Sequence, residues 1–143
     1  MSLQKFISNL KSYDVEKELL NVVQNNEDVI RDLNTEDQLF QKGIDSKGNK
    51  LPTPYAPFTI AIKQQKGQPT DRITLRDEGD FHNSFFVNAD KFPIRIDATD
   101  EKRDKLVREW GEDIFGLTEQ SLFETRKDIL PDLQDVQKAK LGI

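Results

Sequence analysis

The stretch RITLRDEGDFHNSF, residues 72–85, separates a helical first part of the chain from the region where strand patterns occur. Ile73 and Leu75 alternate with polar residues, as in a half-buried strand. Gly79 follows a charged run and suits the positive φ of a turn, while Phe81 suits a core position. The sequence therefore predicts a strand–turn element here, anchored by its phenylalanines.

The strongest strand pattern lies just beyond this element, in FPIRIDAT, residues 92–99. Its two isoleucines alternate with Arg95 and Asp97, which is the period of a strand with one buried face. The apolar run at 85–87 supplies a partner, so we expect a small antiparallel sheet. Residues 59–69 fit either a strand or a short helix.

The first part of the chain, residues 2–42, has apolar residues at spacings of three, four and seven, the period of an amphipathic helix. Polar residues at suitable places mark where helices begin, and a glycine marks the end. The expected boundaries are N-caps at Ser2 and Asp14, a capping box of Thr35 and Gln38 that opens a further turn or two, and a stop at Gly43.

Two more helices are expected after the sheet. Thr99 or Asp100 caps the first, and Gly111 closes it. Thr118 starts the second, which Pro131 should kink or split because proline lacks the backbone donor of a helix interior.

Between the first helices and the sheet lies GIDSKGNKLPTPYAPF, residues 43–58, with three prolines. A connection of this length in a small protein is expected to be a functional loop or an ordered arm. We therefore predict one domain over 1–143, made of a helical N-terminal segment (1–42), a Pro-rich arm and an α+β core (59–143). The expected fold class is α+β, with a long N-terminal helical segment, a small antiparallel sheet and two C-terminal helices.

Composition narrows the classes of function. The formal net charge is −5 and the pI about 5.0, which argues against broad binding of nucleic acid. Cysteine is absent, so disulfides, thiolate nucleophiles and zinc sites with cysteine ligands are excluded. The sequence has no apolar run long enough to cross a bilayer, and no signal-peptide pattern at its start. These features predict a chain that works in a cytoplasm without a membrane partner.

Acidic, basic and hydroxyl residues gather around Gly79, and His82 is the only histidine. A small hydrolase built on His82, Asp80 and Ser84 is one hypothesis, but no fixed spacing defines a nucleophile, a base and a group that orients the base. DSKGNK, residues 45–50, lacks the ligands of a calcium loop and is better read as a polar β-turn. We therefore predict no catalytic residue, no cofactor and no metal, and a chain that is not an enzyme.

Three segments in order match a pattern: LFQKGIDSKGNKLPTPYAPFTIAIKQQKG, then RITLRDEGDFHNSF, then WGEDIFGLTEQSLFETRKDIL. The first is a polar arm with an aromatic–proline piece that ends in lysines. The second contains a Leu-x-x-x-Gly-x-Phe-x-x-Ser element. The third has Trp–Gly before a Phe-Gly-Leu-Thr-Glu helix start. Together they resemble the tail-completion, or virion-morphogenesis, proteins of tailed bacteriophages and prophages, over roughly residues 35–135.

The resemblance implies a structural protein that completes or caps the tail tube at the head–tail junction by binding terminal tube subunits. It implies tail-tube or connector proteins as partners, self-association, with a hexameric ring as one form, and a place in the tail or neck of a virion assembled in the bacterial cytoplasm. Alternatives are another head–tail connector or neck adaptor, or a host binding module. The interaction residues it suggests are Pro54, Tyr55, Arg76, Glu78, Gly79, Asp80, Phe81, Trp110 and Phe115.

Overall fold

A computed structural model describes residues 2–52 and 55–143. The α+β prediction is confirmed: the described chain is mostly helical, with a two-stranded antiparallel sheet and a long C-terminal helix. The elements in chain order are α1 (Leu3–Ser12), α2 (Val15–Asn25), α3 (Glu27–Asp32), the π-helix η1 (Leu33–Lys42), α4 (Pro57–Gln65), α5 (Asp80–Asn83), β1 (Phe85–Asn88), β2 (Arg95–Ala98), α6 (Arg103–Trp110), the 3₁₀ turn η2 (Glu112–Ile114) and α7 (Glu119–Leu141).

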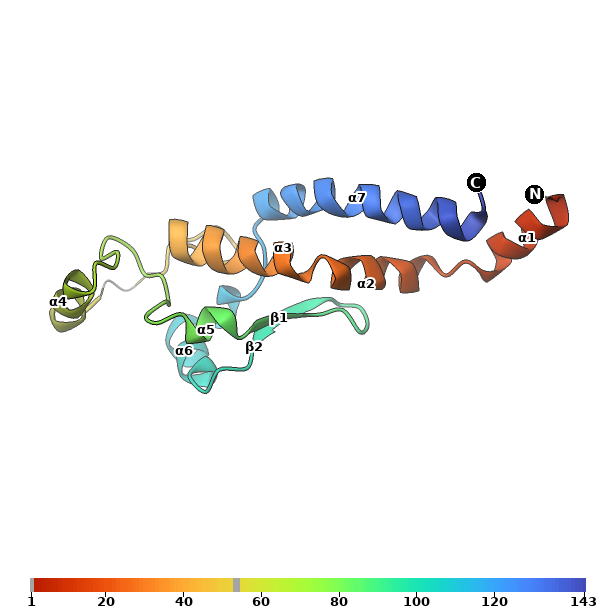
Figure 1. Cartoon of the computed structure of the whole chain (residues 1–143). Coiled ribbons are helices and arrows are strands. Elements are labelled where there is room, and N and C mark those ends of the chain that lie inside the picture. The colour runs from red at the N-terminus through yellow and green to blue at the C-terminus, as the bar shows by residue number, and fades with distance from the viewer. Residues whose placement is uncertain (1, 53–54) are drawn as a thin grey trace.

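The molecule is elongated (Figure 1). The helices from α2 to η1 run along its length, with α7 beside them on one side and the β1–β2 hairpin on the other. The two chain ends lie together at one end of the molecule, near α1, and α4 lies at the opposite end. The core is therefore built along a central helical rod.

The predicted caps of the first helices are confirmed. The Ser2 hydroxyl accepts a hydrogen bond from the Lys5 amide at 3.2 Å, and the Asp14 carboxylate accepts one from the Lys17 amide at 3.1 Å. Each occupies one backbone donor that a helix start leaves free. Gly43, with a φ of 62°, ends η1 in the left-handed conformation.

The predicted capping box of Thr35 and Gln38 is wrong, because α3 passes into η1 without an interruption. Thr35 has helical neighbours and its hydroxyl donates to the Arg31 carbonyl at 3.0 Å, a bond made within a helix. The Gln38 side chain is fully buried and reaches another segment of the chain. Thr35 and Gln38, which resemble a helix start in the sequence, thus lie inside a helix, and Gln38 bonds to a distant segment.

The strand predictions are confirmed after Ser84 and wrong before it. The hairpin forms as expected, with Phe85 opposite Ala98 and Val87 opposite Ile96. No strand forms at Ile73 and Leu75, which lie in irregular backbone.

The reason lies at Thr74, between those two residues. The Tyr55 hydroxyl accepts a hydrogen bond from the Thr74 amide at 2.9 Å, and the Thr74 carbonyl bonds to the His82 ring at 2.9 Å. Side chains therefore hold the backbone groups that a neighbouring strand would pair with.

Two other segments now have a definite form. The ambiguous residues 59–69 are helical through Gln65, because Pro57 occupies the first position of α4, where a missing donor costs nothing. In the Pro-rich arm, the Asp45 carboxylate accepts bonds from the Lys47 and Asn49 amides, so DSKGNK is the predicted polar turn. The Ser46 amide then donates to the Asp113 carbonyl at 2.8 Å, which fastens the arm to η2.

The predicted cap of the first C-terminal helix at Thr99 or Asp100 is wrong, because α6 begins at Arg103, after Lys102, without a side-chain cap bond. The Asp100 carboxylate accepts from the Lys102 amide at 2.9 Å in the turn before the helix, and Gly111 ends the helix as expected. The Thr118 hydroxyl caps α7 by accepting from the Ser121 amide at 3.2 Å.

The expected split at Pro131 is wrong, since α7 continues through it. Contacts on both sides of the proline hold α7 in place. Before it, Ile129 packs against the apolar cluster that contains Val23 of α2. After it, Asn26 donates to the Asp132 carboxylate at 3.0 Å, and Lys140 lies 3.8 Å from Glu18. One missing backbone bond is tolerated where such contacts fix the helix on each side.

Two apolar clusters make the core. One lies under the sheet and α6 and includes Leu39, Phe81, Phe85 and Ile114. The other joins α2 and α3 to the hairpin through Val23, Ile30, Val87 and Ala89. Burial of these side chains is the main stabilising contribution.

Candidate interaction site

A hollow of about 270 Å³ lies between α4, the loop at 75–81 and α6; we name it the α4–α6 groove. Among the suggested interaction residues it is lined by Tyr55, Arg76, Glu78, Gly79, Asp80, Phe81 and Trp110. Three segments that are distant in sequence therefore meet at one place. Pro54 lies outside the described residues.

The loop at the floor of the groove is shaped by two residues with positive φ. Gly79 has a φ of 97° and precedes α5, which fulfils the predicted turn. Leu75 has a φ of 55°, a conformation that non-glycine residues seldom adopt. Surrounding contacts must hold such a residue in place, and backbone strain of this kind is concentrated at functional sites.

Arg76 is fixed from the side of η1. Its guanidinium lies 3.1 Å from the Glu36 carboxylate and 4.6 Å from the centre of the Phe40 ring. The ion pair is largely exposed and contributes little on its own. Its effect is to orient the arginine along one wall of the groove.

Lys63, which sequence reasoning missed, is a buried cation in the wall of the groove. Its ammonium donates to the Arg76 carbonyl at 3.1 Å and lies 4.7 Å from the centre of the Tyr55 ring. Thr59 and Lys63 stand four residues apart on α4, so a helical period would have placed them on one face. The sequence gives no indication, however, that this face of α4 lines a groove together with α6.

A salt bridge closes one end of the groove, with the Lys66 ammonium 2.7 Å from the Asp77 carboxylate. The hydrogen bond from Lys66 lowers the pKa of Asp77, and the same bond raises the pKa of Lys66. Gln68 adds a bond to the Asp77 carbonyl at 2.8 Å. These contacts tie the turn after α4 to the loop.

His82 lies behind this loop and is buried. Burial lowers its pKa to about 4, against a smaller opposite effect of the bond to Thr74, and the charge of Arg76 lowers it further. Because the Thr74 carbonyl can only accept, the Nε2 atom carries the proton and Nδ1 is left without a partner.

Two of the three groups proposed for a hydrolase, His82 and Ser84, are engaged elsewhere. The Ser84 hydroxyl donates to the Phe81 carbonyl at 2.8 Å and accepts from the Asp100 amide at 3.0 Å. Asp80 begins α5 and is exposed. The contacts of Ser84 and His82 thus hold backbone, and neither side chain bonds to the other.

Of the suggested residues, Phe81 is buried in the core and Phe115 is partly buried against it. Phe81 is 3% exposed, and its ring centre lies 5.0 Å from that of Phe85. Phe115 packs on the same pair, 5.2 Å from Phe85, and the Arg103 guanidinium covers its ring. Phe81 therefore anchors the groove from below, and Phe115 supports it without lining it. Trp110 is half-buried against the same cluster.

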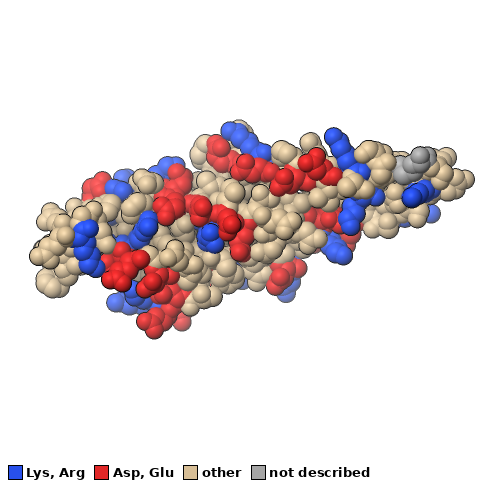
Figure 2. Space-filling model, viewed as in Figure 1, with Lys and Arg blue, Asp and Glu red and all other residues tan. Residues whose placement is uncertain are grey.

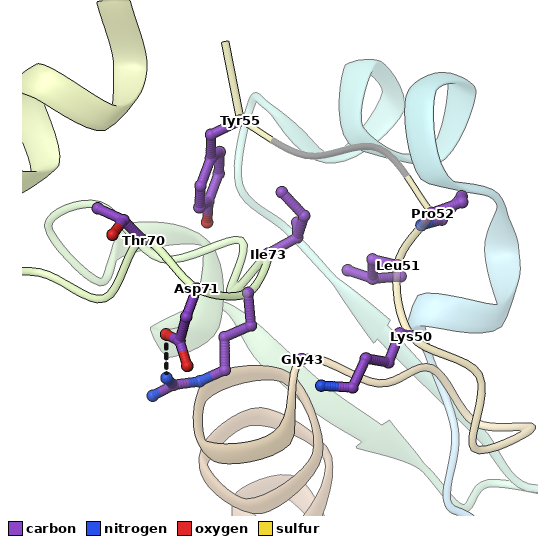
Figure 3. A pocket seen from close by; sticks show the side chains of 9 residues that line it. Gly43, Lys50, Leu51, Pro52, Tyr55, Thr70, Asp71 and Ile73 are labelled. Carbon is purple, nitrogen blue, oxygen red and sulfur yellow. Dashed lines mark hydrogen bonds and ion pairs between the residues drawn. The ribbon is translucent and has the colours of Figure 1, made fainter. Parts of the chain in front are cut away.

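A second hollow, of about 220 Å³, adjoins the first and shares Tyr55 with it. Figure 3 shows Lys50 and Leu51 of the arm facing Thr70, Asp71 and Ile73, with Tyr55 above them. The Tyr55 ring separates the two hollows, and its hydroxyl is directed to the loop. The arm thus supplies one wall of each.

Within residues 2–52 and 55–143, no cluster of three or more His, Asp or Glu side chains is placed to hold a metal ion. None of the helices in the same ranges is long and apolar enough to span a membrane. Both acidic and basic side chains lie on the visible face, and the acidic ones gather in groups over its middle (Figure 2). The groove itself mixes both signs, from Lys63, Arg76 and Lys102 to Glu78 and Glu109.

Comparison with models of protein families, with curated proteins and with solved structures gives no match to this chain. A family is therefore not shown by similarity, and the function is argued from the residues and their arrangement.

Proposed function

We propose that this chain is a structural protein of a bacteriophage or prophage that completes the tail tube at the head–tail junction, where it binds terminal tube subunits. One observation carries the proposal. Each of the three segments behind the resemblance contributes to the α4–α6 groove: Tyr55 from the first, the loop at 75–81 from the second and Trp110 from the third. A pattern shared with an assembly family is expected to gather where a partner binds.

The chemistry of the groove suits a protein surface. It offers half-buried aromatic side chains, Tyr55 and Trp110, beside exposed charges of both signs. Aromatic anchors surrounded by a polar rim are typical of protein–protein interfaces. The charges are mixed, so the groove favours a protein partner over a small anion.

The test is binding of purified tail-tube protein to the chain, measured by pull-down and by light scattering. Glu78 and Glu109 are exposed groove residues, and we expect Glu78→Lys combined with Glu109→Lys to weaken binding by at least an order of magnitude. Asp90→Lys combined with Asp135→Lys reverses two exposed acids that do not line the groove, and this matched control should bind as the unmodified chain does.

Other outcomes point to the alternatives. Capture of portal-side proteins in place of tube subunits would indicate a neck adaptor. A soluble partner in cells without phage genes would indicate a host binding module. A hydrolase would lose its activity in His82→Ala, whereas assembly would persist.

A further inference from the structure

The helix α1 presents an apolar stripe that the rest of the chain does not cover. Leu3, Ile7 and Leu10 are 68%, 41% and 46% exposed and stand at positions i, i+4 and i+7, on one face of the helix. The half-buried residues of α1 are Phe6 and Asn9, and Asn9 donates to the Leu141 carbonyl at 3.4 Å. We name the three exposed residues the α1 stripe. The flank of the helix beside the stripe holds it to the end of α7, while the three stripe residues themselves stay exposed.

A groove elsewhere on the chain has the complementary character. It measures about 430 Å³ and runs between α2, the strand β2 and the first half of α7; we name it the α2–α7 groove. Its lining is almost entirely apolar and includes Leu19, Val23, Ile94, Ile129, Leu130 and Leu133. Leu122 and Leu130 in its wall are about half exposed. The volume is within the range of roughly 300–1,000 Å³ that is common for binding sites.

We propose that the α1 stripe of one copy docks into the α2–α7 groove of a second copy. An amphipathic helix that lays anchors at i, i+4 and i+7 into an apolar groove is a recurring mode of recognition. A ten-residue helix such as α1 is about 15 Å long, which suits a contact with two to three turns of α7. Each copy carries both halves of the contact.

The structure favours a second copy over the chain's own groove. α1 lies at one end of the molecule, beyond the start of α2 (Figure 1). To fold back, it would have to give up the bond from Asn9 to Leu141 and disturb Asp14, which caps α2. Docking into another copy needs neither change, because the stripe already faces outward.

Charge complements the apolar fit. Between Leu3 and Ser12 the only charged residues are Lys5 and Lys11, both basic. The first half of α7, over residues 119–132, has four acids and two bases, one of which, Arg126, lines the groove. Lys127 pairs with Glu124 at 3.4 Å, which leaves Asp128 and Asp132, each beside a groove residue, as the acids that face Lys5 and Lys11 of a docked α1. Figure 2 shows acidic side chains in a row over α7. This attraction is exposed and screened by salt, so it should guide α1 more than it strengthens the contact.

The contact is heterologous, because a stripe meets a groove and not another stripe. Copies joined in this way form a closed ring or an open filament, according to the rotation between neighbours. The inference deepens the self-association part of the proposed function and rests on that part alone. It does not depend on the tube protein, so a failure of tube binding leaves it standing.

The experiment is light scattering of the purified full chain over a wide concentration series. The unmodified chain should assemble well above the monomer mass of 16.5 kDa. Ile7→Glu removes the stripe and Leu130→Glu blocks the groove, and each variant alone should stay monomeric. Phe58→Glu, at an exposed apolar position on α4, is the control and should assemble normally.

Mixing the two monomeric variants gives the sharpest readout. Ile7→Glu retains an intact groove and Leu130→Glu an intact stripe, so the mixture should form a one-to-one dimer and stop there. A monomeric unmodified chain, an assembly unaffected by either variant, or a mixture without dimer would each overturn the proposal. Circular dichroism checks folding, and Leu3→Glu and Leu122→Glu replace any variant that unfolds.

Discussion

At the scale of one residue, the burial of His82 leads to a prediction about how the stability of the protein depends on pH. Its pKa is lowered from 6.5 to about 4 in the folded chain, mainly by burial. Between these pH values the unfolded chain binds a proton at His82 that the folded chain does not. The contribution of neutral His82 to the free energy of unfolding is therefore fully present above pH 6.5. As the pH is lowered from 6.5 toward 4, this free energy decreases by about 1.4 kcal/mol per pH unit.

The check is the free energy of unfolding in urea at a series of pH values between 6.5 and 5. His82→Gln keeps a donor for the Thr74 carbonyl and does not titrate, so its stability should be nearly flat over this range. His82 is the only histidine in the chain, and few other groups contribute there. Equal slopes in the two proteins would contradict the buried neutral form.

Two glycines with positive φ give a second residue-scale prediction. At Gly43 an added Cβ would lie 2.9 Å from the Arg72 Cβ and 3.0 Å from the Ile73 carbonyl, while at Gly48 it would meet nothing within 4 Å. Gly48→Ala should cost about 1 kcal/mol, from backbone strain alone. Gly43→Ala should cost about 2–4 kcal/mol, because overpacking adds to that strain. Equal losses in urea denaturation would show that the close approach is absent.

At the scale of elements, two side chains of η1 form hydrogen bonds with the backbone of the segment before α7, in the way that a neighbouring strand would. Asn34 donates to the Ile114 carbonyl and accepts from the Gly116 amide, at 3.0 and 2.8 Å. Gln38 donates to the Gly116 carbonyl and accepts from the Thr118 amide, both at 2.9 Å. Both side chains are fully buried. The direction of α7 therefore depends on two amides in η1.

Gln38→Ala should cost about 2–4 kcal/mol, because it leaves a partly buried carbonyl and a partly buried amide unpaired and removes a fully buried side chain. Gln65→Ala removes the same side chain from an exposed position on α4 and should change stability by less than about 0.5 kcal/mol. Urea denaturation of both variants measures the difference. A small loss for Gln38→Ala would mean that water replaces the amide at little cost.

At the scale of the whole molecule, stability should be uneven along the chain. α1 has no buried residue, whereas η1 holds the fully buried Leu39 and both amides. Few buried contacts permit local opening. In dilute monomeric protein, backbone amides of α1 should exchange with deuterium much faster than those of η1, with α2 between them.

The same measurement responds to assembly. At concentrations where copies associate, α1 and the part of α7 that lines the α2–α7 groove should gain protection together. α4, at the opposite end, is the internal reference and should not change. Fast exchange of η1 in the dilute protein would contradict the arrangement of the core.

Much of the fold could be predicted from local patterns. Ser2, Asp14 and Thr118 cap helices as predicted, and Gly43 and Gly111 end them. The alternation at 92–99 gave the second strand of the hairpin. These features depend on hydrogen bonds and periods within a few residues, which the sequence states directly.

The sequence by itself thus determined the α+β class, the caps at Ser2, Asp14 and Thr118, the helix ends at Gly43 and Gly111, the hairpin and the turn at Gly79. Only the tertiary structure decided the rest. The backbone of Thr74 bonds to the side chains of Tyr55 and His82 and not to a neighbouring strand. The side chain of Gln38 does not cap a helix but accepts a bond from the distant Thr118 amide. The tertiary structure also brought Lys63 opposite α6. These contacts join residues that are far apart in the sequence. A local pattern of residues does not show which distant groups will come into contact.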